Sequence, residues 1–296
     1  MDASLLGKTF VITGATSGIG LAVAGALAQS SASVIGVGRS VERCRQAEEL
    51  IGTLNPEARI AYCLADLSLQ SQVHSLAGKI RERLSGWEGK ALDGLLNNAG
   101  TVPFWQTLTP EGFDVQWAVN HLAPFLLTLE LFPLLQAADA SRVVTVSSGS
   151  HYGAKLNWDD IQMLKHYAPL RAYKQTKLCN VLFSAELNRR LGNGSRVKAF
   201  AADPGLVNTE IGLKSNSWVA RWVWDLRRRG GISTEEAARG VVYLLAEPAI
   251  QDARDVYWKH GQPKAPNPYA LNEAAAQRLW NLSAQMCGIK SDEVLP

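Results

Sequence analysis

The chain has 296 residues, of which 47% are hydrophobic, and its 30 basic and 27 acidic side chains leave a net charge of +3. Such a length can bury a sizeable core and suits one large α/β domain over 1–296 better than several small ones. A charge so close to balance gives no electrostatic case for a nucleic-acid partner. A small-molecule role is therefore the better hypothesis.

The cysteine spacing and the N-terminus indicate the compartment. Four cysteines lie far apart without a C-x-x-C pair, and the five histidines have no metal-ligand spacing. Neither a metal site nor a disulfide framework is therefore expected. The start MDASLLGKTF lacks a signal-peptide pattern, and no run of about 18 uninterrupted apolar residues occurs. We expect reduced thiols and a cytoplasmic location.

Short apolar runs alternate with longer helical patterns along the chain. This alternation predicts a parallel sheet of about seven strands with helices on both faces, a doubly wound α/β fold. The expected strands are 9–13, 32–38, 59–65, 92–97, 142–147, 197–202 and 255–258, and the helical patterns cover roughly 18–30, 40–53, 69–86, 110–138, 170–191, 234–246 and 271–286.

The segment TGATSGIG at 13–20 follows the first expected strand and leads into a helix. Gly14, Gly18 and Gly20 let the backbone turn sharply and approach a pyrophosphate, whose charge the free N–H groups of the helix start attract. Glycines also make ordinary tight turns, but strand, loop and helix occur here in the order of a Rossmann-type nucleotide site. The segment therefore predicts dinucleotide binding.

The end of the second expected strand indicates which dinucleotide binds. Gly38 stands where an NAD-binding protein usually offers an acidic side chain to the ribose hydroxyls, and Arg39 follows it. A guanidinium there can hold a 2′-phosphate through paired hydrogen bonds. Arg43 and Arg45 nearby extend the basic character, so NADP(H) is favoured over NAD(H). The alternative is that Arg39 is a solvated loop residue.

Tyr173 is the only tyrosine in the chain with a lysine four positions later. Residues i and i+4 lie on the same helix face, so Lys177 can lie near the phenol. A phenol with an ordinary pKa of about 10 needs a nearby positive charge to favour its anion. The pair predicts an acid–base group, although a single match of this kind can arise by chance.

Seven motifs in a fixed order make the chain resemble the short-chain dehydrogenase/reductase family over nearly its whole length. They are TGATSGIG, ADLS at 65–68, NNAG at 97–100, Asn120 in VNHLAPF, VSS at 146–148, Tyr173 with Lys177, and DPGLVNT at 203–209. The resemblance implies hydride exchange between a nicotinamide and a carbonyl or alcohol. It makes Tyr173 the acid/base, Lys177 the residue that lowers its pKa and holds the ribose, and Ser148, rather than Ser147, the group that binds the substrate oxygen.

The resemblance also implies a set of cofactor-binding residues. Asp66 is expected to face the adenine, Asn98 the adenosine ribose, and Pro204, Val207 and Thr209 the nicotinamide and diphosphate. The full set is Gly14, Thr16, Ser17, Gly18, Ile19, Gly20, Arg39, Asp66, Leu67, Asn98, Ala99, Gly100, Tyr173, Lys177, Pro204, Gly205, Val207 and Thr209.

Asn120 is followed four residues later by Pro124 in the same helical pattern. Proline has no N–H to return to the Asn120 carbonyl and would clash with it, so we expect a kink with that carbonyl left free. In the family, the corresponding carbonyl binds a water that relays protons to the lysine. A purely structural kink is the alternative.

Ser148 and Tyr173 are 25 positions apart, a wide gap that resembles the retinol dehydrogenase-like branch, including the oxidoreductase domain of its WW-domain-containing member. The resemblance implies a lipophilic carbonyl or alcohol substrate, retinal- or steroid-like. The run YKQTKLCN also resembles light-dependent protochlorophyllide reductase, in which a cysteine at the Cys179 position has a role. A non-catalytic NADP-binding regulator is a further alternative, against which Asn120, Ser148, Tyr173 and Lys177 together argue.

The segment 217–229 carries Trp218, Trp222 and Leu226 on one helical face, followed by three arginines. It lies within 210–232, where the resemblance implies a substrate lid. Such a helix can close over an apolar ligand, pack on the core, or make peripheral contact with a membrane surface. Family members often pair through helices like 110–138 and 170–191, so a homo-oligomer is one option.

Overall fold

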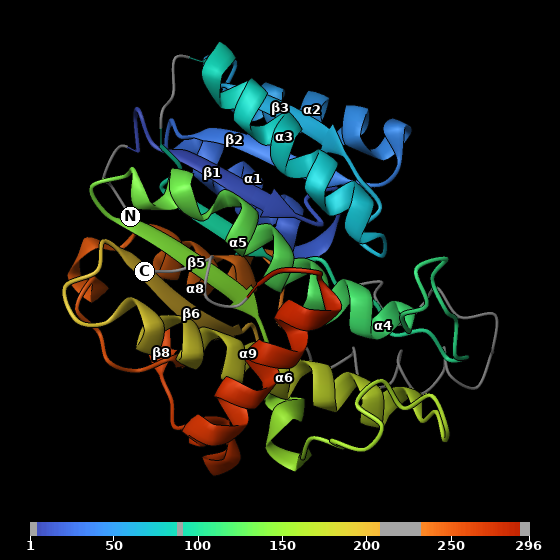
Figure 1. Ribbon diagram of the computed structural model, residues 1–296. Coiled ribbons are helices and arrows are strands. Elements are labelled where there is room, and N and C mark those ends of the chain that lie inside the picture. Colours follow the sequence, from blue (N-terminus) through green and yellow to red (C-terminus); the bar gives the residue numbers. More distant parts are fainter. Residues whose placement is uncertain (1–4, 88–90, 208–231, 291–296) are drawn as a thin grey trace.

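The computed structural model contains one eight-stranded sheet between two layers of helices (Figure 1). It describes residues 5–87, 91–207 and 232–290. In sheet order the strands are β3 (Ile60–Leu64), β2 (Ser33–Gly38), β1 (Thr9–Thr13), β4 (Gly94–Asn97), β5 (Ser141–Val146), β6 (Val197–Asp203), β7 (Tyr257–Lys259) and β8 (Gln262–Pro263).

The first seven strands are parallel to their neighbours, and only β8 pairs in the antiparallel direction. The expected doubly wound parallel sheet is therefore confirmed. Strand β8 was missed because two residues, one of them Pro263, carry no alternation that a sequence pattern could reveal. The strand order reverses between β1 and β4, the kind of position at which open α/β sheets bind ligands.

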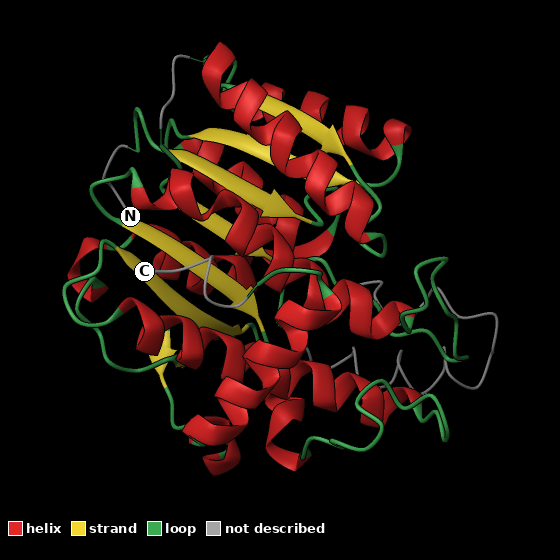
Figure 2. Ribbon diagram, in the orientation of Figure 1, coloured by secondary structure: helices red, strands yellow, loops and turns green. Residues whose placement is uncertain are grey.

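The helices divide between the two faces of the sheet (Figure 2). Consecutive strand residues point to opposite faces: Phe10 and Ile12 of β1 belong to one buried cluster, and Val11 belongs to the other. The first cluster lies under α1 (Gly18–Gln29), α2 (Val41–Leu54) and α8 (Thr234–Ala246). The second lies under α3 (Gln70–Gly86), α5 (Ala123–Gln136), α6 (Pro169–Leu191) and α9 (Glu273–Met286).

Within the described residues, one stretch, Val115–Gln136, is long and apolar enough to cross a membrane. Its most apolar window is, however, 78% buried inside the fold. On α5, Phe125 lies edge-on to Trp280 of α9, with 5.0 Å between ring centres. The apolar composition of this stretch is that of a core helix packed on several sides.

The helix expected over 110–138 is interrupted at Asn120. It begins as α4 (Val115–Trp117), passes through a π-helical turn η1 (Ala118–Leu122), and continues as α5. The amide after the π turn bonds to a carbonyl five residues back, so the turn is wider than an α-helical one. Because Pro124 cannot donate to the Asn120 carbonyl, this irregularity lies where the sequence predicted a kink.

The carboxyl ends of β1, β4, β5 and β6 meet at one edge of the sheet. The residues that follow these strands belong to the motifs TGATSGIG, NNAG, VSS and DPGLVNT. Segments distant in sequence therefore come together at the switch point, and helix α6 brings Tyr173 and Lys177 to the same place.

Candidate active site

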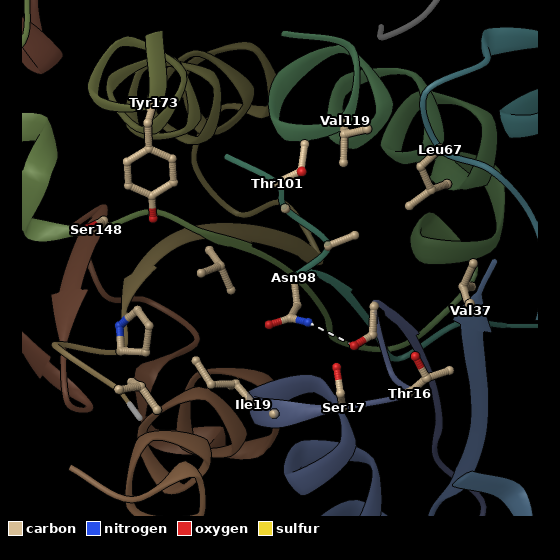
Figure 3. Close-up of a pocket in the computed structure, with 18 of the residues that line it drawn as sticks. Thr16, Ser17, Ile19, Val37, Leu67, Asn98, Thr101, Val119, Ser148 and Tyr173 are labelled. Carbon is tan, nitrogen blue, oxygen red and sulfur yellow. Dashed lines mark hydrogen bonds between the residues drawn. The ribbon is translucent and has the colours of Figure 1, made fainter. Parts of the chain in front are cut away.

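A cavity of about 980 Å³ opens at this edge of the sheet. Figure 3 shows it from within, with the loop after β1 on one side and Tyr173 on the other. Of the residues predicted from the sequence, it is lined by Gly14, Thr16, Ser17, Gly18, Ile19, Arg39, Asp66, Leu67, Asn98, Ala99, Gly100, Ser148, Tyr173, Lys177, Pro204, Gly205 and Val207.

The glycine loop is shaped by positive backbone angles and close contacts. Gly14 has φ +65° and Gly18 φ +56°, which other residues rarely adopt. Gly20 does not line the cavity. A Cβ there would lie 2.3 Å from the Gly14 carbonyl oxygen, so this glycine allows the loop to close against helix α1.

The first turn of α1 faces the cavity. Its N-cap Ser17 makes no side-chain cap hydrogen bond, and the first turn carries no acidic residue. The loop is held to β4 by Asn98, whose Nδ2 donates to the Thr13 and Gly14 carbonyl oxygens at 3.0 and 3.2 Å. The helix start thus presents unneutralised N–H groups and a positive dipole end, an arrangement that binds phosphates.

Three arginines follow β2, and they differ in what they contact. Arg39 and Arg43 line the cavity, and neither makes an ion pair within the described chain. Arg45 instead pairs with Glu42 at 3.0 Å and Glu49 at 2.8 Å on the outer side of α2. Two arginines without ion-pair partners in the described chain therefore follow Gly38, the position at which NAD-binding proteins usually carry an acidic residue.

Asp66 and Leu67 form the wall beyond β3. The Asp66 carboxylate accepts hydrogen bonds from the Ser68 amide at 2.9 Å and the Ser68 hydroxyl at 2.8 Å. Figure 3 shows the Leu67 side chain pointing toward the same side of the cavity as Val37. Local turn bonds thus fix this wall.

Tyr173 projects from α6 into the cavity, with its hydroxyl directed toward Ser148 (Figure 3). The pKa of Tyr173 is raised to about 12, mainly by burial; a hydrogen bond with Ser148 opposes the rise, and the charge of Asp203 adds to it. The phenol is therefore protonated at neutral pH in this arrangement, and lowering its pKa requires additional positive charge.

Lys177 is buried one turn along α6 from Tyr173. Its Nζ lies 5.5 Å from the centre of the Tyr173 ring and donates a hydrogen bond to the Val146 carbonyl oxygen at 2.8 Å. Burial lowers the pKa of Lys177 to about 8, and the charge of Asp203 opposes that effect. The amine is thus held in the cavity wall rather than in solvent.

The two serines after β5 have different partners. Ser147 is buried and donates its hydroxyl to the Lys177 carbonyl oxygen at 2.7 Å, which ties β5 to α6. Ser148 lines the cavity, and its Oγ accepts a hydrogen bond from the Ser150 amide at 3.2 Å. The geometry therefore leaves Ser148, the serine favoured by the family resemblance, facing Tyr173.

Asn120 does not line the cavity. Its side chain accepts from the Thr101 amide at 2.8 Å and donates to the Thr101 carbonyl oxygen at 2.9 Å and the Thr176 hydroxyl at 3.3 Å. These bonds hold the loop after NNAG, whose Thr101 does line the cavity. The side chain thus has a positioning role that the sequence did not reveal.

Asp203 is a buried carboxylate that sequence reasoning missed. Its oxygens accept from the Gly205 amide at 2.9 Å and the Tyr257 hydroxyl at 2.6 Å. Its charge acts on the pKa values of both Tyr173 and Lys177. Asp203 opens the quoted motif DPGLVNT, but its tyrosine partner lies 54 positions away on β7.

Some predictions fall outside the described residues. Thr209 and the segment 217–229 lie there, as does nearly all of the lid expected over 210–232. Missed cavity residues include Arg43, Thr101, Leu170, Lys174 and Leu206. Leu206 and Lys174 lie inside the quoted segments DPGLVNT and YKQTKLCN, which gave them no role, whereas Thr101 and Leu170 lie in no motif.

The family model described as "short chain dehydrogenase" matches residues 8–220. The chain belongs to the short-chain dehydrogenase family. It is 35% identical to human retinol dehydrogenase 13, a match that covers 99% of this chain and 88% of the relative, and 33% identical to human polyprenol dehydrogenase, covering 95% and 86%.

Solved structures agree with this assignment. An uncharacterised protein from Mycobacterium paratuberculosis superposes with a TM-score of 0.76 at 31% identity, covering 97% of this chain and 96% of that one. The landomycin C-6 ketoreductase, solved with NADP and rabelomycin, gives a TM-score of 0.66 at 25% identity, covering 87% and 96%. This short-chain dehydrogenase is thus an oxidoreductase acting on CH–OH and C=O groups of small substrates.

Proposed function

We propose that this short-chain dehydrogenase uses NADP(H) to interconvert a lipophilic aldehyde or ketone and its alcohol, with Tyr173 as the acid/base. The observation that carries the proposal is that Tyr173, Lys177 and Ser148 line the same cavity as the glycine loop. The acid–base groups and the dinucleotide-type loop therefore open onto one space.

The chain's residues fit the cofactor at both ends. The first turn of α1 and the Gly14 turn offer N–H groups to a diphosphate. A Cβ on Gly14 would lie 3.0 Å from Ala99 Cα, so only glycine leaves the loop this close to β4. Arg39 and Arg43 offer guanidinium groups to a 2′-phosphate. When bound, the nicotinamide supplies or accepts the hydride.

Tyr173 handles the proton. In the reducing direction its hydroxyl donates a proton to the carbonyl oxygen as that oxygen gains negative charge, and in the oxidising direction its oxygen takes the proton from the alcohol. The Tyr173 hydroxyl is directed toward Ser148 (Figure 3), so a second hydroxyl can bind the same substrate oxygen. The two donors then stabilise the charge that develops on that oxygen.

Lys177 supplies positive charge to this pair. Its amine is buried 5.5 Å from the centre of the Tyr173 ring, and in a poorly solvated site a cation at that range favours the phenolate. The Val146 carbonyl, which accepts from both Lys177 and Asn180, keeps the amine in place. The backbone carbonyl at Asn120, which Pro124 cannot partner, is the proposed site of a water that relays protons to Lys177.

The cavity wall near Tyr173 supports a lipophilic substrate. The apolar side chains that line it come from several segments: Val115, Val119, Leu170, Leu206 and Val207. Of these, Leu170 and Leu206 are about half exposed. The names of the relatives, retinol and polyprenol dehydrogenases, refer to long apolar alcohols. The alternative of a pigment reductase lacks support, because Cys179 is fully buried in the core and does not line the cavity.

The test is NADPH consumption with a panel of long-chain aldehydes, retinal and ketones. We expect turnover that Tyr173→Phe lowers by about 10²- to 10⁴-fold, since a general acid contributes that much, while NADPH binding is kept. Tyr243→Phe on α8 is the matched control, because that ring lies in the opposite helical layer, and it is expected to retain activity. Binding of NADPH without turnover across the panel would favour a regulator instead.

A further inference from the structure

His151 lies directly behind Ser148 and is fully buried. Its Nδ1 is 2.8 Å from the Ser148 carbonyl oxygen, and its amide donates to the same oxygen at 3.1 Å. Ser148 itself is extended, with φ −169° and ψ 152°, and caps the short helix η2 (Gly149–Gly153). The Ser148 carbonyl oxygen thus accepts two hydrogen bonds from His151, one from the ring and one from the main-chain amide.

The other ring nitrogen of His151 fixes its protonation. Nε2 lies 3.0 Å from the main-chain nitrogen of Asn267, which can only donate. Nε2 must therefore be the acceptor, and the ring proton must be on Nδ1, where it is donated to Ser148. A main-chain amide far away in sequence thus determines the tautomer of His151.

Asn267 is held in turn by a dense set of bonds. Its Nδ2 lies within 3.2 Å of the carbonyl oxygens of His151, Tyr152 and Ala154, and its Oδ1 accepts from the Tyr269 amide at 2.9 Å. The C-terminal segment before η5 (Pro268–Leu271) is therefore locked onto η2. Such a fully bonded buried network holds one geometry.

The surroundings keep the imidazole neutral. The rings of Tyr152 and Tyr257 lie 4.2 and 4.6 Å from it, centre to centre. Burial lowers the pKa of His151, the hydrogen bond to Ser148 and the charge of Asp203 oppose this, and Lys264 reinforces it. A neutral ring with a fixed tautomer is a donor of constant direction.

We propose that His151 is a positioning residue for the reaction: its Nδ1–H holds the Ser148 main chain so that Oγ faces Tyr173, and Asn267 sets the tautomer that makes this bond. The inference rests on the proposed function, because it assigns Ser148 to the substrate oxygen. The glycine loop with Thr16 and Ser17 lies across the cavity from Ser148 (Figure 3), so we expect the bond to Ser148 to act on the chemical step rather than on NADPH binding.

Two substitutions of His151 distinguish the roles of its two ring nitrogens. In His151→Asn, Nδ2 occupies nearly the position of Nδ1 and can still donate to Ser148. In His151→Gln, the side-chain amide reaches toward Asn267, and the Ser148 carbonyl oxygen keeps only the main-chain donor of residue 151. We expect His151→Gln to lower kcat about 10- to 100-fold, as misplacement of a reacting group by an ångström does, with the KM for NADPH unchanged. His151→Asn is expected to recover kcat to within about threefold of wild type.

A purely packing role predicts a different pattern. Both variants would then lose kcat in proportion to their loss of thermal stability, or neither would lose it, and either result would overturn the proposal. Asn272→Ala is the matched control in the same segment. It removes the N-cap bond to the Ala275 amide without touching the network, so it should lower the melting temperature and leave kcat intact.

A readout without turnover keeps the inference separate from the proposed function. In ¹⁵N-histidine-labelled protein at pH 7.5, the signals lost in His151→Asn identify His151. Shifts of the neutral Nδ1–H tautomer are expected, whereas the Nε2–H tautomer or rapid exchange between the two would refute the tautomer lock. If the lock is found but no carbonyl is reduced, the proposed function has failed and the positioning of Ser148 stands only as geometry.

Discussion

Lys177 Nζ lies 5.5 Å from the centre of the Tyr173 ring, with both side chains lining the cavity one helical turn apart on α6. Burial acts on both groups in the direction that disfavours charge: the pKa of Tyr173 is raised to about 12 and that of Lys177 is lowered to about 8. The pair thus combines a phenol that resists ionisation with the cation that can promote it. Keeping this cation buried costs folding free energy.

Lys177→Met is expected to stabilise the protein while abolishing turnover. A pKa lowered from 10.5 to about 8 corresponds to roughly 3 kcal/mol of destabilisation when the amine is charged. Loss of the hydrogen bond to the Val146 carbonyl lowers the free energy of unfolding by about 1 kcal/mol and so offsets part of this gain. Urea unfolding at pH 7 should therefore show a free energy of unfolding about 2 kcal/mol higher than that of wild type.

The pH dependence of this difference tests its cause. Between pH 8 and 10.5 the unfolded chain still binds a proton at Lys177 and the folded chain does not, so wild-type stability from this group rises with pH. The advantage of Lys177→Met should shrink across that window and then level off. A difference that stays constant from pH 7 to 10 would show that the buried charge is not its source.

Cofactor preference should depend on Arg39 and Arg43 but not on Arg45. Arg39→Asp removes a cation from the cavity and adds a carboxylate, so we expect NADPH affinity to fall at least tenfold, while NADH affinity holds or rises. Arg43→Ala should act in the same direction more weakly. Arg45→Ala, which removes only the pairs with Glu42 and Glu49, is the control. Fluorescence titration with both coenzymes measures this, and an unchanged preference in Arg39→Asp would refute the assignment.

Trp280 packs helix α9 against helices α5 and α6. Its ring is stacked with Phe183 at 5.9 Å and lies edge-on to Phe125 at 5.0 Å, with the Arg190 guanidinium 4.5 Å above it. Trp280→Ala is expected to lower the free energy of unfolding by about 3–5 kcal/mol. Trp105→Ala is the comparison, since that ring is 81% exposed and its loss should change stability by no more than about 0.5 kcal/mol. Equal effects in urea unfolding would contradict this packing account.

The same helix bears on oligomeric state. Helix α9 packs on α6 and reaches Phe125 of α5, so it covers part of the surface through which the family resemblance suggested pairing. We expect sedimentation equilibrium to give a monomer, because a dimer through α5 and α6 would have to displace Trp280. A stable dimer whose interface includes these two helices would contradict that expectation.

Local patterns were sufficient for most of the fold. The strand at 9–13 and the helix at 234–246 were predicted to the residue, because their apolar patterns are local properties of the sequence; in the structure Ser233 caps that helix. The Asn120–Pro124 spacing also predicted the break in the long helix, since the missing N–H of proline is a local property. The π form of that turn was not predictable, because it depends on how α5 packs against the rest of the core.

The unpredicted parts of the site are contacts between distant segments. Asp203 meets Tyr257, and His151 meets Asn267, 116 positions away. No spacing rule relates such pairs, and only the closing of the sheet edge and the C-terminal segment brings them together. The sequence places His151 three residues after Ser148, and only the fold brings the Asn267 amide to its ring.

The most direct test of the central claim is the ionisation of Tyr173 in the NADP⁺ complex, followed by ¹³C NMR of labelled tyrosine with Tyr173→Phe to assign the signal. The account predicts a pKa below about 9, since nearby cations lower a phenol's pKa by one to several units, and a clearly higher pKa in Lys177→Met. A phenol that titrates near 12 in the complex, or one that is unaffected by Lys177→Met, would contradict it.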